Sequence, residues 1–131
     1  MKSKKEFPAF SISEIEDGIA LIEYKGIEMD LDSMIHLYDE IEKFGNGNKI
    51  AILNTFKEYV PTNDEAMKYA ASDRPPKLLY ASAIHVEFLA TRLAIMMFMK
   101  FNKQRVPRKV FSSKRKALEW LREMRATNSR H

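Results

Sequence analysis

The chain has no cysteine, which excludes disulfide bonds and thiolate metal sites. It also lacks a long apolar run, because the longest, residues 93–99, is far shorter than the roughly 20 residues of a membrane-spanning helix. No apolar segment follows the basic N-terminus, so we expect no signal peptide. These absences predict a single cytoplasmic domain over residues 1–131 with no membrane span, in which residues 1–6 and 126–131 are flexible.

Motifs for catalysis, phosphate binding and metal binding are absent as well. The one cluster of glycines, Gly45–Lys49, precedes an expected strand, whereas a phosphate-binding loop follows a strand and opens a helix. His85 and Glu87 would share one face of a strand, but a metal site needs three or four donors. We therefore expect no enzymatic activity, no cofactor and no metal ion, and we interpret His85 as structural.

The hydrophobic pattern predicts alternating strands and helices. Residues 10–15 and 19–24 form a hairpin around Asp17–Gly18, because an Asp-Gly pair suits a tight turn. The remaining elements are expected as a helix after Asp30 or Asp32, a strand at 50–54, a helix to 70 capped by Thr62 or Asn63, a strand at 78–86, a helix at 88–101, a strand at 107–111 and a helix capped by Ser112 or Ser113. This order, β-β-α-β-α-β-α-β-α, indicates an α/β fold whose mixed sheet has a parallel core.

Two of these helices have faces that can be assigned. In the first, the expected buried stripe is Leu31, Met34 or Ile35, Tyr38 and Ile41, with Glu40 and Lys43 facing water. In the last, it is Ala117, Leu118, Leu121 and Met124, with Trp120 beside it.

The helix at 88–101 is unusual because it is apolar nearly all round. One stripe contains Leu89, Leu93, Met96 and Met97, and another contains Ala90, Ala94, Phe98 and Phe101. A helix that lies on a sheet needs an apolar stripe of only about 100°, so its outer side requires a further cover. Neighbouring helices, a second subunit or an apolar ligand could each provide it. The candidate interface or ligand-binding residues are Leu89, Leu93, Met96, Met97 and Met99; Arg92, the charge in the middle of the helix, is expected to be structural.

Charge is distributed unevenly, because residues 1–99 have a formal net charge of −5 and residues 100–131 have one of +9. The last helix begins with Ser112, Ser113, Lys114 and Arg115, where hydroxyls, free backbone N–H groups and cations could form an anion site, or simply a solvated basic turn. The basic segment has no interleaved exposed aromatic residues, because Phe101, Phe111 and Trp120 are expected to be buried. Nucleic acid is therefore not an expected partner.

The opening hairpin, the strand at 50–54, the run 81–101 and the ending Asn102…Val106-Pro107…Lys109-Val110-Phe111…Ala117-Leu118-Glu119-Trp120-Leu121 resemble a known family. This is the STAS-like family of small bacterial proteins, similar in fold to anti-sigma-factor antagonists and distantly to CRAL-TRIO lipid-transfer domains. The resemblance implies a four- or five-stranded mixed sheet, often a homodimer. Those antagonists have a phosphorylatable serine after the central strand, where this chain has Asn54-Thr55-Phe56-Lys57, so only Thr55 or Thr62 could replace it as a phospho-switch.

Two functions follow from these observations. The leading hypothesis is a non-enzymatic, STAS-like regulatory or scaffold module that acts through protein–protein interaction and self-associates through residues 88–101. The alternative is a carrier or sensor of a small apolar, lipid-like ligand held between that helix and the sheet, which requires an apolar cavity there. A weaker third hypothesis is electrostatic docking of the basic segment on anionic lipid or nucleic acid.

Overall fold

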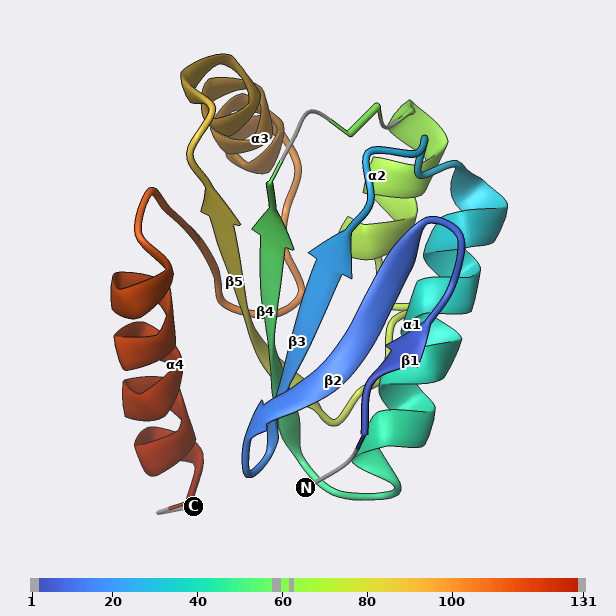
Figure 1. Ribbon diagram of the computed structural model, residues 1–131. Helices are drawn as coiled ribbons and strands as arrows, with labels where there is room; N and C mark the ends of the chain where they lie inside the picture. Colours follow the sequence, from blue (N-terminus) through green and yellow to red (C-terminus); the bar gives the residue numbers. More distant parts are fainter. Residues whose placement is uncertain (1–2, 58–59, 62, 130–131) are drawn as a thin grey trace.

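A computed structural model of the chain, which describes residues 3–57, 60–61 and 63–129, shows an α/β fold (Figure 1). Within these residues a mixed sheet of six strands is combined with four helices. The elements are β1 (Lys5–Glu6), β2 (Phe10–Glu16), β3 (Ile19–Tyr24), α1 (Leu31–Gly45), β4 (Ile50–Phe56), α2 (Asp64–Ala71), β5 (Leu79–Val86), α3 (Leu89–Phe101), β6 (Arg108–Phe111) and α4 (Lys114–Ser129).

The strands lie across the sheet in the order in which they occur in the chain. Strands β1, β2 and β3 are antiparallel neighbours, and β3, β4, β5 and β6 are parallel neighbours. The predicted fold class and element order are confirmed, with β1 as an additional edge strand.

The hairpin forms where the sequence predicts it. Gly18 has φ of +78°, a backbone conformation that glycine adopts without the steric penalty of a Cβ atom. The pairing also contains an irregularity between Glu14 and Glu16, next to the turn.

Helix α1 begins after Asp30, whose carboxylate accepts a 2.9 Å hydrogen bond from the Ser33 amide, so Asp30 rather than Asp32 is the cap. The buried apolar side chains of the helix are Met34, Leu37, Tyr38, Ile41 and Phe44.

The prediction that Glu40 faces water is wrong, since this residue is only 6% exposed. Its carboxylate lies 3.2 Å from Lys43 Nζ and 3.6 Å from Lys5 Nζ of strand β1. A buried carboxylate requires such partners, and one of them comes from a strand that the sequence pattern does not reveal.

The helices cover the two faces of the sheet separately. Helices α1 and α2 pack on one face, and α4 packs on the other, against β4 and β5 (Figure 1). Asn63 caps α2 by accepting a 2.9 Å hydrogen bond from the Ala66 amide. In α4, Ala117 and Leu121 are fully buried, which confirms the centre of the predicted stripe, while Trp120 packs against Phe111.

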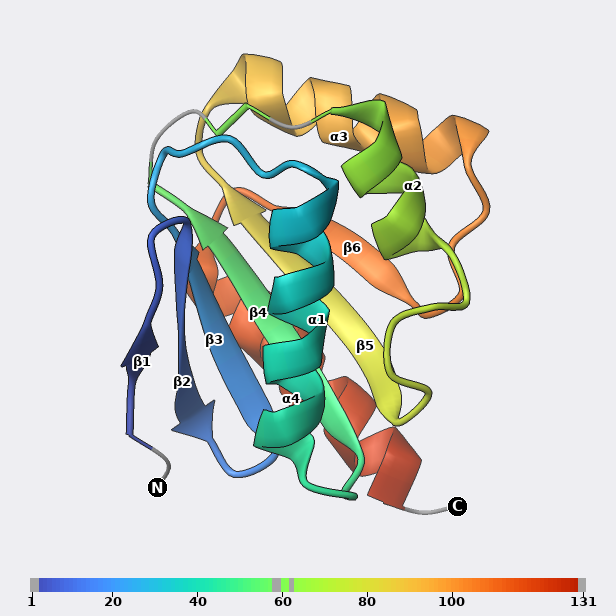
Figure 2. The same ribbon diagram turned by 90° about the vertical axis from the view of Figure 1, so that its right-hand side faces the viewer.

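Helix α3 lies apart from both layers. It runs across the end of the sheet to which β4 and β5 point (Figure 2). No residue from Leu89 to Phe101 is buried, and Phe101, which we expected to be buried, is 74% exposed. The sheet ends below this helix, so it cannot bury one face in the way that α1 and α4 do.

Regular secondary structure begins earlier and continues further along the described residues than the sequence pattern predicts. Lys5 and Glu6 pair with Ile12 and Ser11, and α4 continues to Ser129 rather than ending near residue 125. Residues 1–2 and 130–131 lie outside the described part of the chain.

Candidate apolar ligand site

A cavity of about 470 Å³ lies at the carboxyl ends of the parallel strands, between the sheet, α1, α2 and α3. Tyr24, Asn54 and Ile84 of three neighbouring strands line it from the sheet, and Met34 and Met67 line it from α1 and α2. Most lining side chains are apolar. In sheets with a parallel core, ligands bind in crevices at this end of the strands.

Helix α3 forms the outer wall of the cavity with one of its two apolar stripes. Ala90, Ala94 and Phe98, four residues apart, line the cavity, together with Ile95 and Met99. The structure thus places one of the five interface or ligand candidates, Met99, on the cavity.

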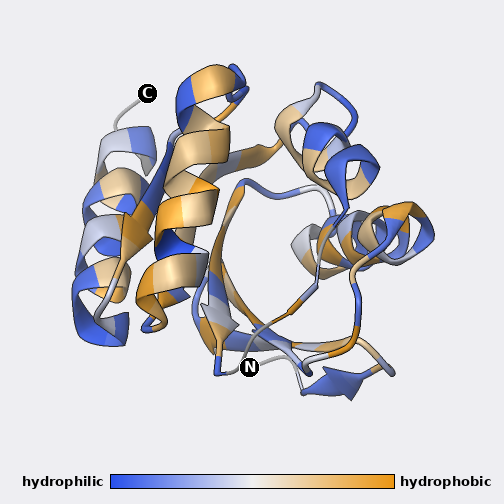
Figure 3. Ribbon diagram, turned by 90° about the horizontal axis from the view of Figure 1, so that it is seen from above, coloured by the Kyte–Doolittle hydropathy of each residue, from blue (hydrophilic) through white to orange (hydrophobic). Residues whose placement is uncertain are grey.

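The other four candidates lie on the opposite side of α3. Leu89, Leu93, Met96 and Met97 are between 50% and 63% exposed. In the hydropathy colouring, α3 is orange or tan over most of its length (Figure 3). Neighbouring helices of the same chain therefore do not cover this stripe, which leaves a second subunit or an apolar ligand as the expected cover.

A hydrogen-bonded set of polar groups lies on the sheet side of the cavity. The Tyr24 hydroxyl donates to Asn54 Oδ1 at 2.8 Å, and Asn54 Nδ2 donates to Ser82 Oγ and to the Ala83 carbonyl, both at 3.1 Å. Burial raises the pKa of Tyr24, so its hydroxyl stays protonated at neutral pH. These groups bond to each other, so an apolar ligand beside them leaves none of these donors unpaired.

A guanidinium group lies at the β6 side of the cavity. Arg108 Nη2 lies 3.4 Å from both the Tyr38 hydroxyl and the Ala70 carbonyl, and Arg108 Nη1 donates to Gln104 Oε1. These contacts join β6 to α1, α2 and the segment after α3. The sequence does not reveal this group, because Arg108 and Tyr38 are 70 positions apart and share no motif.

A second hollow of about 490 Å³ lies at the opposite end of the sheet. Its lining includes Glu14, Asp17, Lys49, Arg125 and Asn128, so it is much more polar than the cavity below α3. We therefore take the cavity below α3 as the candidate site for an apolar ligand.

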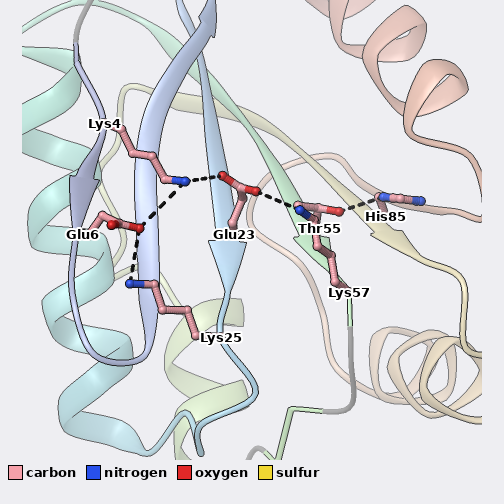
Figure 4. Close-up of polar contacts among 7 residues, drawn as sticks. All are labelled: Lys4, Glu6, Glu23, Lys25, Thr55, Lys57 and His85. Atoms are coloured by element: carbon pink, nitrogen blue, oxygen red, sulfur yellow. Dashed lines mark hydrogen bonds and ion pairs between the residues drawn. The ribbon is translucent and has the colours of Figure 1, made fainter.

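The phospho-switch hypothesis does not hold for Thr55. The strand β4 continues through Phe56, so Thr55 lies inside the sheet and is 2% exposed. Its hydroxyl lies 2.7 Å from His85 Nδ1 (Figure 4), and no kinase could reach it without unfolding the strand. Thr62, the other candidate, lies outside the described residues.

His85 is structural in this geometry, as the sequence predicts. Burial lowers its pKa and Lys114 lowers it further, while Glu87, 3.7 Å away, acts in the opposite direction. The imidazole is therefore neutral at pH 7. Among the described residues no group of three or more His, Asp or Glu side chains is placed to hold a metal ion.

Close to Thr55 and His85, a chain of ion pairs runs over the surface of β1, β3 and the end of β4 (Figure 4). Lys4 lies 3.8 Å from Glu6 and 3.3 Å from Glu23, and Lys57 lies 3.5 Å from Glu23. Burial acts to raise the pKa of Glu23, but the two lysines bring it below its usual value. Exposed pairs of this kind contribute about 0–1 kcal/mol each, so we interpret them as a surface feature.

The anion-site candidates have partners that the sequence does not reveal. Ser113 Oγ accepts a hydrogen bond from the Lys116 amide at 3.3 Å, and Arg115 lies 2.6 Å from Glu119. Ser112 and Lys114 stand beside them at the exposed start of α4. Anion binding at this helix end remains a prediction.

Arg92 makes a structural contact, as we expected. Its Nη1 donates to the Val86 carbonyl at 3.3 Å, at the end of β5.

Across the part of the chain that the structure covers, no helix is both long and apolar enough to cross a membrane.

Comparison with solved structures identifies the class of fold. The chain is similar to an uncharacterized protein of the DUF3478 family with a SpoIIAA-like fold from Shewanella loihica PV-4, with a TM-score of 0.54 and 17% identity over 86% of this chain and 92% of that one. This chain is thus an α/β protein with a SpoIIAA-like, that is STAS-like, fold, and this is the fold that the resemblance seen in the sequence implies.

Residues 13–125 match the family described as "Domain of unknown function (DUF7793)", and the chain belongs to this family. No curated protein matches the chain.

Proposed function

We propose that this protein is a non-enzymatic binding module that holds a small, largely apolar ligand in the cavity below α3, as a carrier or sensor. The observation that carries the proposal is the cavity itself, about 470 Å³ between α3 and the sheet. This volume falls within the 300–1,000 Å³ typical of small-molecule sites.

The contacts of α3 support this assignment. Neither hydrophobic core of the described residues includes an α3 side chain, so the helix covers the cavity without completing a core. The chain places Ala90 and Ala94 on the cavity side, where larger residues would fill the space. Small side chains over an apolar cavity leave room for a ligand.

A cavity-filling substitution tests the proposal. Titration with a neutral, environment-sensitive dye such as Nile red should give saturable binding to the wild-type protein, and Ala94→Trp should weaken it about tenfold or more by occupying the cavity. The matched control is Ala126→Trp, because Ala126 is exposed on α4, away from the cavity. The absence of saturable binding to the wild type, or equal effects of both substitutions, would overturn the proposal.

The exposed stripe of α3 favours a second function, that of a regulatory or scaffold module that self-associates. Leu89, Leu93, Met96 and Met97 form an apolar patch on one side of a single helix. Patches of this type mark interaction sites, and methionine side chains adapt readily to a partner surface. The two functions use opposite sides of α3, so one helix could serve both.

A further inference from the structure

We propose that the ligand has a single carboxylate in addition to its apolar portion, and that Arg108 binds this carboxylate. The inference rests on the proposed function, because it assigns the polar head of the ligand that the cavity holds. It is based on the position and partners of Arg108.

Arg108 is a half-buried cation whose hydrogen-bond partners are all neutral. They are the Tyr38 hydroxyl, the Ala70 carbonyl and the Gln104 side chain, and the first two lie at 3.4 Å, which is long for such bonds. Within the described residues no carboxylate forms an ion pair with Arg108. A partly desolvated guanidinium with such neighbours gains free energy when an anion approaches.

The other polar groups of the lining do not compete for this role. Asn54 and Ser82 bond to each other and to neighbouring groups on the sheet. Asp64, the other charged residue of the lining, is exposed in the first turn of α2 and forms no ion pair with Arg108. Arg108 thus supplies the positive charge of the described lining.

The chemistry of the guanidinium favours a carboxylate. Its planar N–H groups match the two oxygens of a carboxylate in a bidentate pair. One arginine also balances one negative charge, whereas a monoalkyl phosphate carries nearly two at neutral pH. The apolar portion of the ligand would then lie along Ile95, Phe98 and Met99 of α3, which line the same cavity.

Calorimetric titration of the full chain with matched probes tests the head group. Decanoate and 1-decanol have the same apolar tail, and decyl phosphate adds a second charge. We expect the wild-type protein to bind decanoate at least about tenfold more tightly than 1-decanol, because a charge-assisted pair contributes roughly that factor. In Arg108→Gln, decanoate and 1-decanol should bind with about equal affinity, because the variant lacks the positive charge.

Arg74→Gln is the matched control, since Arg74 is exposed and lies outside the lining; it should not alter either affinity. The preference of the wild type for decanoate over 1-decanol needs no variant, so it remains informative even if Arg108→Gln does not fold. Equal affinities for acid and alcohol, or tighter binding of decyl phosphate, would overturn the carboxylate assignment while the proposed function stands. Failure of all three probes to bind the wild type would overturn both.

Discussion

Tyr24 and Asn54 lie on the adjacent parallel strands β3 and β4, and the tyrosine hydroxyl donates a 2.8 Å hydrogen bond to Asn54 Oδ1 beside the cavity. Both residues are buried, at 9% and 6% exposure. Asn54 also bonds to Ser82 Oγ and the Ala83 carbonyl on β5, so a single amide joins three strands. This set of bonds fixes the polar part of the cavity wall.

Substitution of Asn54 should therefore lower stability more than loss of one hydrogen bond would. Asn54→Leu leaves the Tyr24 hydroxyl and the Ala83 carbonyl without this partner, and each buried unsatisfied group costs about 1–3 kcal/mol. We expect the free energy of unfolding, measured in urea, to fall by about 2–3 kcal/mol. Adding Tyr24→Phe should restore about 1 kcal/mol, because the unpaired hydroxyl is removed. Additive effects of the two substitutions would contradict the coupling.

The burial of the His85 imidazole predicts how the free energy of unfolding depends on pH. Burial lowers the pKa of His85 in the folded protein below its ordinary value of 6.5, so the unfolded chain binds the proton more tightly. The free energy of unfolding should thus be highest above pH 6.5 and decline as the pH falls through the folded pKa.

His85→Asn, which does not titrate, should flatten the decline between pH 7 and 5. Carboxylates with lowered pKa, such as Glu16 beside Arg122, lose their contribution only below about pH 4.5 and do not interfere. Parallel stability curves for the wild type and the variant would show that His85 does not control this range.

The outer stripe of α3 predicts the oligomeric state. The wild-type protein should sediment as a dimer at tens of micromolar, and Leu93→Glu with Met97→Glu should yield a monomer, because two charges would enter the interface. Both residues are more than half exposed, so the folded chain should lose less than about 0.5 kcal/mol. Leu78→Glu, at another exposed leucine, is the control. A wild type that stays monomeric at these concentrations rules out self-association.

Amide exchange should distinguish α3 from the other helices. It has no buried side chain, so its amides should exchange faster than those of α1 and of the buried part of α4. A bound apolar ligand should slow exchange in α3, since binding stabilises the folded arrangement in which α3 covers the cavity. Slowing that is uniform over all helices would instead indicate a general increase in stability.

The fold was predictable because the sequence patterns that indicate its strands, helices and turns are local. The Asp17–Gly18 turn, the cap at Asp30 and the apolar runs of β4 and β5 each depend on a few neighbouring residues. Lys5–Glu6 was not predictable as a strand, since two charged residues show no period and their pairing depends on Ile12 and Ser11. That strand also supplies Lys5, one of the partners of the buried Glu40 carboxylate.

The candidate site was predictable only in part. The apolar character of residues 88–101 on nearly all sides indicated that something besides the sheet must contact this helix. The sequence also showed two apolar stripes, which correspond to the side that lines the cavity and the exposed outer side. The sequence could not say which stripe faces the cavity, because that depends on where β5 ends. Nor could it bring together Tyr38, Ala70 and Arg108, which only the folded chain places at one corner. Thr55 was misplaced because the strand continues two residues beyond the expected end.

The separation of α3 from both hydrophobic cores has a consequence for how this protein can change during evolution. Substitutions along residues 89–101 alter the cavity wall and the outer stripe without removing any side chain from either core. Substitutions in α3 should therefore cost little folding stability, while Ile52, Leu53 and Leu121 stay under selection for packing. Under the proposed function, proteins that share this architecture should differ most along α3.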